Sequence, residues 1–269
     1  MSDLSATAAA TRPTPEAARR RGISDAEWAT RCDLAALYRL AALHGWGDLL
    51  ATHISARVPG ERNHFLINPY GMLFEEITAS SLVKVDEDGR VLSETEYIVN
   101  PAGFVIHSCI HMARPEIECV MHLHTRDGTG VATQKCGLLP ITQHALVIYE
   151  QVTYHDFEGP ALDPDEQSRL VRDLGDKRIM ILRNHGTLTA GRSVGEAFVL
   201  MYRIERACRM QLAAQTGGNE LYPLPQSVVD KSIETGRKIF SKSGFGGEGH
   251  REWAAMLRKL QREGADSAR

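Results

Sequence analysis

Two histidines separated by one residue inside an apolar run constrain this chain more than any other feature. The run is CVMHLHT, residues 119–125. Side chains on a β-strand alternate between its two faces, so a strand here would place His122 and His124 side by side, with Met121 and Leu123 in a core. Neutral imidazole nitrogen binds Zn, Fe, Mn or Co, so this pair supplies half of a transition-metal site. Taken alone, the pattern fits equally well a half-buried strand whose polar face carries two histidines.

A third histidine follows another predicted strand. Residues 178–183, RIMILR, form a strongly apolar run that leads into Asn184, His185 and Gly186. The glycine permits close backbone approach or a positive φ. With His185 as a third ligand, the site would keep open coordination positions, which is typical of a catalytic metal. The alternative is a histidine that ends the strand and bonds only to backbone.

Composition narrows the class of protein and the kinds of partner. The chain has 269 residues, enough for one large or two small domains, of which 43% are hydrophobic and 24% charged. A formal net charge of -3 does not favour nucleic acid or an anionic membrane as partner, and no apolar run approaches the ~18 residues of a membrane span. Five scattered cysteines without a C-x-x-C pair, and an N-terminus without the order of a signal peptide, predict a cytoplasmic protein.

The order of the predicted elements favours one α/β domain over residues 23–269, after a flexible N-terminal tail over residues 1–22. Ser24 and Glu27 form a capping box that opens a helix ending near Gly45. Because strands and helices interleave without a regular βαβ period, we expect a mixed, mostly antiparallel central sheet covered by helices. Helices are predicted at 104–113, 127–135, 163–174, 194–214 and within 225–260, and strands within 48–58, at 65–68, at 178–183 and in a hairpin around residues 88–89.

Four blocks of sequence, taken in order, resemble the class II aldolase/adducin family. They are IxCVMHLHT at 117–125, KCGLLPIT at 135–142, YHDFEG at 154–159 and LRNHGTLTAGRS at 182–193. The resemblance covers roughly residues 25–215 and is nearest to the adducin-head side of the family and its bacterial relatives. It implies a three-layer α/β/α fold and a homotetramer or other homo-oligomer with sites near subunit boundaries. It also implies a divalent metal on His122, His124 and His185, with zinc preferred and Mn or Fe as alternatives.

The chain departs from this resemblance at the positions where the sugar-phosphate aldolases of the family perform catalysis. Alignment on His107 places residues 101–103, PAG, where those enzymes have a Ser-Ser-Glu segment whose Glu binds metal and acts as acid/base. Gly103 can do neither. The family's Gly-Asn-hydrophobic-Ser block is represented by residues 52–55, THIS, and its Thr-Gly turn by residues 70–71, YG. Donors to a phosphate group are therefore reduced, and we expect a substrate without phosphate.

These features predict a metal-dependent lyase acting on a small, non-phosphorylated carbonyl compound, oxo acid or sugar acid. The reaction would be aldol-type cleavage or decarboxylation, making the protein an aldehyde-lyase or a carboxy-lyase. Two alternatives remain open. One is a non-catalytic oligomerisation module like the adducin heads, and the other is a three-histidine iron enzyme with different chemistry.

Another side chain must replace the missing Glu in any such reaction. We expect acid/base chemistry from His53, Tyr149 or His155, with His144 and His107 as further candidates. For each of these side chains the alternative is a structural role in packing or hydrogen bonding. The residues expected to contact substrate are Thr52, His53, Asn68, Gly71, Gly103 and His107.

Overall fold

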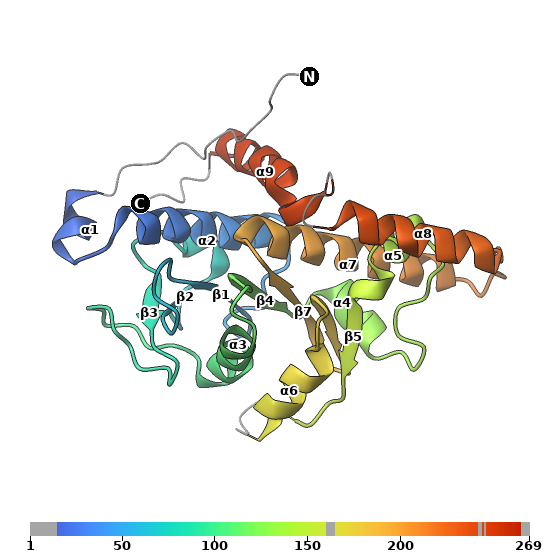
Figure 1. Cartoon of the computed structure of the whole chain (residues 1–269), viewed down its shortest axis with the longest axis horizontal. Coiled ribbons are helices and arrows are strands. Elements are labelled where there is room, and N and C mark those ends of the chain that lie inside the picture. The colour runs from blue at the N-terminus through green and yellow to red at the C-terminus, as the bar shows by residue number, and fades with distance from the viewer. Residues whose placement is uncertain (1–14, 160–164, 242–243, 245, 265–269) are drawn as a thin grey trace.

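A computed structural model describes residues 15–159, 165–241, 244 and 246–264 (Figure 1). Its elements in chain order are α1 (Glu16–Arg20), α2 (Asp25–Leu43), β1 (His53–Arg57), β2 (Phe65–Ile67), the 3-10 helix η1 (Phe74–Glu76), β3 (Val83–Val85), α3 (Pro101–Ala113), β4 (Cys119–Leu123), α4 (Arg126–Ala132), α5 (Gln143–Leu146), η2 (Tyr149–Gln151), β5 (Val152–His155), α6 (Glu166–Leu174), β6 (Ile179–Leu182), β7 (Gly186–Gly191), α7 (Val194–Gln215), α8 (Gln226–Ile239), η3 (Gly247–Gly249) and α9 (His250–Arg262).

Seven strands form one sheet in the order β3-β2-β1-β4-β7-β6-β5. Every neighbouring pair is antiparallel except β5 and β6, which run parallel. The expected mixed, mostly antiparallel sheet is therefore confirmed. The central strands β1, β4 and β7 are the ones that carry or adjoin the candidate metal ligands.

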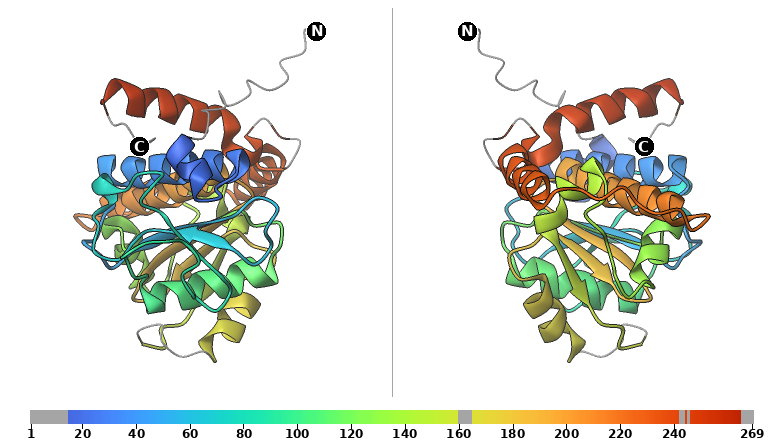
Figure 2. Two further views of the ribbon diagram at one scale, coloured as in Figure 1. Left: turned by 90° about the vertical axis from the view of Figure 1, so that its left-hand side faces the viewer. Right: turned by 90° about the vertical axis from the view of Figure 1, so that its right-hand side faces the viewer.

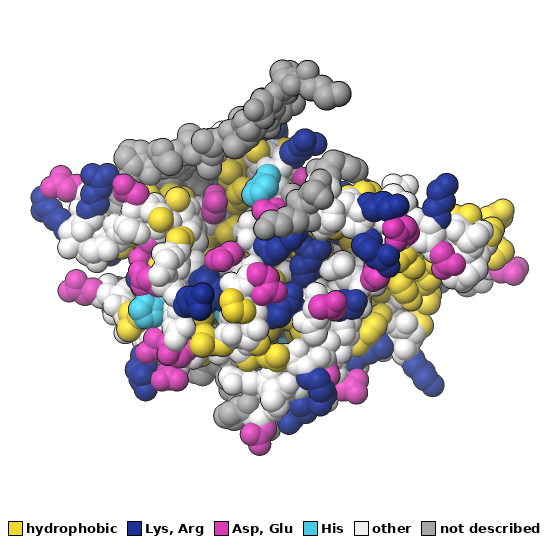
Figure 3. Space-filling view, in the orientation of Figure 1, with side chains coloured by type: hydrophobic (Ala, Val, Ile, Leu, Met, Phe, Trp, Pro, Cys, Tyr) yellow, Lys and Arg dark blue, Asp and Glu magenta, His cyan; other side chains and the backbone are white. Residues whose placement is uncertain are grey.

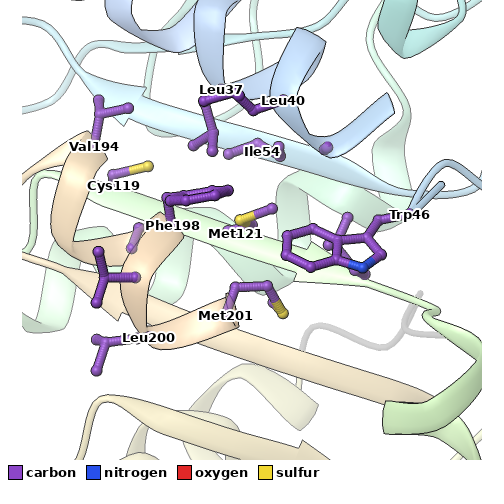
Figure 4. Packing of buried hydrophobic residues seen from close by; sticks show 14 of the residues in the cluster. Leu37, Leu40, Trp46, Ile54, Cys119, Met121, Val194, Phe198, Leu200 and Met201 are labelled. Carbon is purple, nitrogen blue, oxygen red and sulfur yellow. The ribbon is translucent and has the colours of Figure 1, made fainter. Parts of the chain in front are cut away.

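Helices cover both faces of the sheet, which gives the expected α/β/α layers (Figures 1 and 2). Helices α2 and α7 pack on one face, with α9 outside them, and α3 and α6 lie on the other face. Strand alternation divides the strand side chains between two cores. Ile54 and Met121 join Leu37 and Phe198 in the larger core under α2 and α7 (Figure 4), whereas Val120 packs in the smaller core under α3 and α6.

Serine side chains cap the N-termini of the long helices α2 and α7. In α2, the glutamate does not complete the reciprocal capping box. Ser24 accepts a hydrogen bond from Glu27 N at 3.1 Å, as predicted. The Glu27 side chain does not return to the cap but pairs with buried Arg31, one turn along α2. At α7, Ser193 accepts from Glu196 N at 3.0 Å. Both caps satisfy amide groups that would otherwise lack partners at a helix start.

Several element boundaries differ from the sequence-based expectation. Helix α3 begins at Pro101, three residues earlier than predicted, because proline suits the first turn of a helix. Strands β5 and β7 were not predicted, since neither is a continuous apolar run. The expected tail over residues 1–22 lies outside the described residues up to position 14, and its last part contains α1, in which Ala18 is buried. The predicted helix start at residues 163–164 also lies outside the described residues.

The face shown in Figure 3 carries acidic and basic side chains interspersed, in keeping with the formal net charge of -3. In the described part of the chain, no helix combines the length and the apolar character needed to cross a bilayer.

Candidate metal centre

Three histidines meet where β4 ends and β7 begins. His122 lies in β4 and is paired with His53 of β1 on one side and Leu188 of β7 on the other. His124 follows the end of β4, and His185 lies in the turn between β6 and β7. One nitrogen of each ring lies within 4.8 Å of the others, and this is the one such cluster of potential metal ligands found among the described residues.

The turn that carries His185 has two backbone features that bring it to β4. Asn184 has a φ of 56°, in the left-handed region that asparagine tolerates better than most residues. A Cβ on Gly186 would lie 2.4 Å from the Leu123 carbonyl oxygen. Glycine is therefore required for the close approach of β7 to β4, and this approach sets His185 beside the other two rings.

Hydrogen bonds orient the first two imidazoles. The Thr187 carbonyl oxygen lies 3.1 Å from His122 Nδ1, and a carboxylate oxygen of Asp48 lies 2.9 Å from His124 Nδ1. Both partners accept hydrogen bonds, so each Nδ1 donates and each Nε2 keeps its lone pair. The two Nε2 atoms face one another at 3.1 Å. Such a contact between two lone pairs is repulsive unless a cation or a proton lies between them.

This donor set fits a divalent metal. Zinc–nitrogen bonds of ~2.05 Å in a tetrahedral site separate two nitrogens by about 3.3 Å, close to the observed spacing. Burial, followed by the neighbouring His53 and His185, holds the pKa of His122 well below its usual range. Burial and His124 lower the pKa of His185 to about 4. Neutral imidazoles are the form that binds metal, and three of them leave a position for substrate.

A cavity of about 350 Å³ opens beside the three rings. All three candidate ligands, His122, His124 and His185, line it together with His53. Its wall contains neither Lys, Arg, Ser nor Thr among the described residues. A phosphate group would therefore meet no cationic or hydroxyl side chain in this cavity. The full lining is Ala51, His53, Asn100, Ile106, His122, His124, Phe157, Gly159, Asn184 and His185.

His53 and Gly103 share the space beside the candidate metal ligands. A Cβ on Gly103 would lie 2.3 Å from His53 Cδ2 and 2.5 Å from His53 Nε2. Real Cβ atoms do not approach other atoms so closely, so the imidazole and a side chain at position 103 exclude one another. The ring of His53 thus stands beside the position to which the family resemblance assigns a catalytic Glu.

Behind His53 lies a series of buried polar side chains. His53 Nδ1 is 2.9 Å from His107 Nε2, and His107 Nδ1 is 2.6 Å from Ser55 Oγ. Ser55 Oγ is also 2.8 Å from His111 Nε2, and His111 Nδ1 is 3.2 Å from the Ile117 carbonyl oxygen. His107 was expected to contact substrate, but the structure places it behind His53 and outside the cavity wall.

Two of the three residues expected to supply acid/base chemistry, Tyr149 and His155, do not line the cavity within this single chain. Tyr149 lies in η2 and packs against the core on the other face of the sheet. Both nitrogens of His155 contact carboxylates of α6, at 2.7 Å to Asp173 and 3.4 Å to Glu166. His155 therefore ties β5 to α6 and has no free nitrogen for a substrate.

Three of the residues expected to contact substrate also lie elsewhere. Thr52 is fully buried just before β1, and its hydroxyl has no partner among the described residues. Asn68 lies at the end of β2, where its Oδ1 is 2.8 Å from the Tyr38 hydroxyl. Gly71 occupies an exposed turn with a φ of 110°. Of the predicted substrate contacts, His53 lines the cavity, and Gly103 lies directly against the His53 ring.

Sequence reasoning did not single out several residues that complete the site. Asp48 orients His124, Ser55 and His111 stand behind His53, and Phe157 and Asn100 line the cavity. Ser55 could have been identified from the sequence, because side chains alternate along a strand and Ser55 therefore lies on the same face of β1 as His53. Asp48 precedes β1 in a loop, and no local pattern indicates that its carboxylate would meet a residue 76 positions away.

The fold and the site together define an α/β protein with a mostly antiparallel sheet and a three-histidine cluster suited to a divalent metal. The chain belongs to the class II aldolase and adducin N-terminal domain family, whose model matches residues 32–212.

Individual relatives support this membership along nearly the whole chain. A protein of Caulobacter vibrioides named as a class 2 aldolase family member is 52% identical over 242 residues, covering 90% of this chain and 92% of its own length. Rat alpha-adducin is 43% identical over 244 residues, which cover 87% of this chain and 33% of that protein.

Solved structures agree with these sequence relatives. A crystal structure of an aldolase II superfamily protein from Pseudomonas syringae has a TM-score of 0.88 and 51% identity, covering 94% of this chain and 100% of its own. An L-fuculose 1-phosphate aldolase from Glaciozyma antarctica has a TM-score of 0.77 and 26% identity, covering 96% and 97%. The α/β fold class and the predicted family are therefore confirmed.

Proposed function

We propose that this protein is a metal-dependent lyase that cleaves or decarboxylates a small, non-phosphorylated carbonyl compound, oxo acid or sugar acid. The observation that carries the proposal is the composition of the cavity. Three histidines converge at one end, and its described wall contains no Lys, Arg, Ser or Thr side chain that could hold a phosphate group. This wall suits a substrate held by the metal and by a few polar groups such as Asn100 and Asn184.

His122, His124 and His185 would hold the metal, with zinc preferred and Mn or Fe as alternatives. When bound, a divalent metal supplies a Lewis acid that polarises a carbonyl or carboxylate oxygen. His53 supplies the base, because its Nε2 faces the cavity beside Gly103. In aldol cleavage, His53 Nε2 takes the proton of the hydroxyl group next to the bond that breaks. This role replaces that of the absent Glu.

The same proposal includes a cytoplasmic homo-oligomer, such as a tetramer. It rests on the family resemblance, which places sites near subunit boundaries, and on the exposure of the site. Phe157 lines the cavity, and 54% of its side-chain surface is exposed in this single chain. A neighbouring subunit packed over this edge would close the cavity and exclude water from it.

Metal content tests the first half of the proposal. Protein purified without added metal should contain close to one transition-metal ion per chain, or bind one on addition. His122→Ala and His185→Ala should reduce metal content below about a tenth of an equivalent while the circular dichroism spectrum is unchanged. His250→Ala, which alters an exposed histidine on α9, is the matched control. Full metal content in the His122 and His185 variants would refute the ligand assignment.

A pair of metal-chelating hydroxamates tests the second half. Glycolohydroxamate and phosphoglycolohydroxamate differ only by a phosphate group. We expect the metal-loaded protein to bind the unphosphorylated compound at least as tightly, as measured by isothermal titration calorimetry. Tenfold or tighter preference for the phosphorylated compound would contradict a substrate without phosphate.

A second candidate function is a non-catalytic assembly module, favoured by the 43% identity to rat alpha-adducin over most of this chain. An assembly module has no need of bound metal. Absence of metal from the purified protein, with no binding on addition, would favour this candidate over the lyase. A redox-active iron in the same site would be distinguished by the identity of the metal and by its oxidation on exposure to air.

A further inference from the structure

Four buried side chains form a hydrogen-bonded chain that begins at the cavity and ends at a backbone carbonyl. We call this chain, made of His53, His107, Ser55 and His111, the histidine relay. It crosses from β1 to α3 twice and ends at the Ile117 carbonyl oxygen. All four side chains are at most 4% exposed. Water therefore does not compete for these hydrogen bonds.

The terminal carbonyl fixes the direction of each hydrogen bond. A carbonyl oxygen only accepts, so His111 donates from Nδ1 to Ile117 and keeps a lone pair on Nε2. Ser55 has one hydroxyl proton, which it donates to His111 Nε2, so it must accept from His107 Nδ1. His107 Nε2 then accepts from His53 Nδ1. At the cavity end, His53 Nε2 is left with its lone pair.

This assignment requires neutral imidazoles, and the surroundings supply that condition. Burial and the nearby Arg57 lower the pKa of His111 to about 3. Burial, followed by the neighbouring His111 and His122, holds the pKa of His107 well below its usual range. The guanidinium of Arg57 lies beside the relay, and its Nη2 donates a hydrogen bond to the His111 carbonyl oxygen at 2.5 Å.

We propose that the histidine relay locks His53 in the tautomer protonated at Nδ1, so that an unprotonated Nε2 always faces the cavity. Ser55, His107 and His111 are positioning residues in this scheme. The Ile117 carbonyl cannot take up a proton, so the relay holds a tautomer and does not conduct protons to solvent. The ligand that this nitrogen selects carries a hydrogen-bond donor, such as a hydroxyl group, one or two carbons from the oxygen held by the metal.

The role of His53 as base rests on the proposed function, whereas the tautomer itself can be measured without any reaction. Protein labelled with ¹⁵N and loaded with zinc would be studied by long-range ¹H–¹⁵N correlation of the imidazole resonances. In the native chain, His53 should show a single tautomer with Nδ1 protonated. His53→Gln would assign its resonances. A His53 that carries its proton on Nε2 would overturn the proposal.

Changes at the far end of the relay should reverse the tautomer near the cavity. In His111→Phe, which keeps the ring stacked on Phe65, Ser55 loses its acceptor and can donate to His107 instead. His107 would then be protonated on Nε2 and donate to His53, which would carry its proton on Nε2. Ser55→Ala should give a mixture of tautomers, and Ser55→Thr, which retains the hydroxyl, should give the native one.

Ligand binding gives a second readout. Neither Ser55 nor His111 lines the cavity, so zinc content should remain at one equivalent in these variants. Glycolohydroxamate, whose hydroxyl is the donor for His53, should bind about tenfold more weakly to His111→Phe and with native affinity to Ser55→Thr. An unchanged His53 tautomer in both His111→Phe and Ser55→Ala would refute the relay. Loss of metal binding in the native chain would refute the proposed function and leave the tautomer result standing.

Discussion

The imidazole of His53 fills the space that any side chain at position 103 would need, since a Cβ on Gly103 would lie 2.3 Å from His53 Cδ2. The two positions are far apart in sequence and lie on β1 and α3. Their identities are therefore coupled: a glycine at 103 is what allows a histidine at 53. Any side chain introduced at position 103 would therefore displace the His53 ring.

This coupling predicts the outcome of a double-mutant cycle. Gly103→Ala should destabilise the protein by about 1–3 kcal/mol, because the methyl group forces the His53 ring from its position. In a His53→Ala background the same change should cost much less, since the space is empty. Urea unfolding of the four proteins measures the coupling. Gly47→Ala, where an added Cβ meets nothing within 4 Å, is the control. Additive costs at 53 and 103 would contradict the exclusion.

Asp48 should strengthen metal binding without touching the metal. Its carboxylate accepts from His124 Nδ1 at 2.9 Å, which orients the ring and leaves the Nε2 lone pair for the metal. We expect Asp48→Asn to weaken zinc binding about 10–100-fold, measured by competition with a chromogenic chelator. Asp176→Asn, at an exposed carboxylate after α6, should leave zinc affinity unchanged. Equal affinities in the two variants would show that Asp48 has no part in the site.

Stability should fall as the solution becomes acidic, and His111 contributes to this dependence. Its pKa is about 3 in the folded protein, because burial and Arg57 disfavour the charged ring, against ~6.5 in an unfolded chain. Below pH 6.5 the unfolded state binds more protons, so the free energy of unfolding falls as pH drops from 6.5 towards 3. The full contribution of His111 is present above pH 6.5, and about 1.4 kcal/mol is lost for each pH unit below it.

Urea unfolding at pH 7 and pH 5 measures this dependence. His111→Phe removes one buried imidazole, so its loss of stability between the two values should be smaller than native by up to about 2 kcal/mol. The quantity compared is the change in unfolding free energy between the two pH values. The substitution by Phe also changes the unfolding free energy at each pH, because it removes the hydrogen bond between Ser55 and His111. His250→Ala removes an exposed histidine and should retain the native pH dependence. A His111→Phe variant with the native pH dependence would show that burial does not lower the pKa of His111 in the folded protein.

Local patterns accounted for most of the secondary structure. The apolar runs before His124 and before His185 are β4 and β6, and Ser24 and Ser193 begin α2 and α7 where their capping sequences predicted. Strand β7 was not predicted, because its sequence mixes threonine, alanine and glycine. Its strand conformation is evident only from its pairing with β4 and β6. Propensity is a weak guide where neighbouring strands decide the conformation.

The sequence by itself determined where the three candidate metal ligands lie. Strand alternation set His122 beside His124, and the glycine after His185 indicated the close approach that brings the third ring to them. Tertiary structure alone decided which further side chains join the site. Asp48, His53, Ser55 and His111 meet through contacts between segments 52 to 76 residues apart, and such contacts depend on the sheet order and on the packing of α3. For the same reason Tyr149 and His155, which the sequence offered with His53 as candidates for acid/base chemistry, are directed elsewhere by the fold.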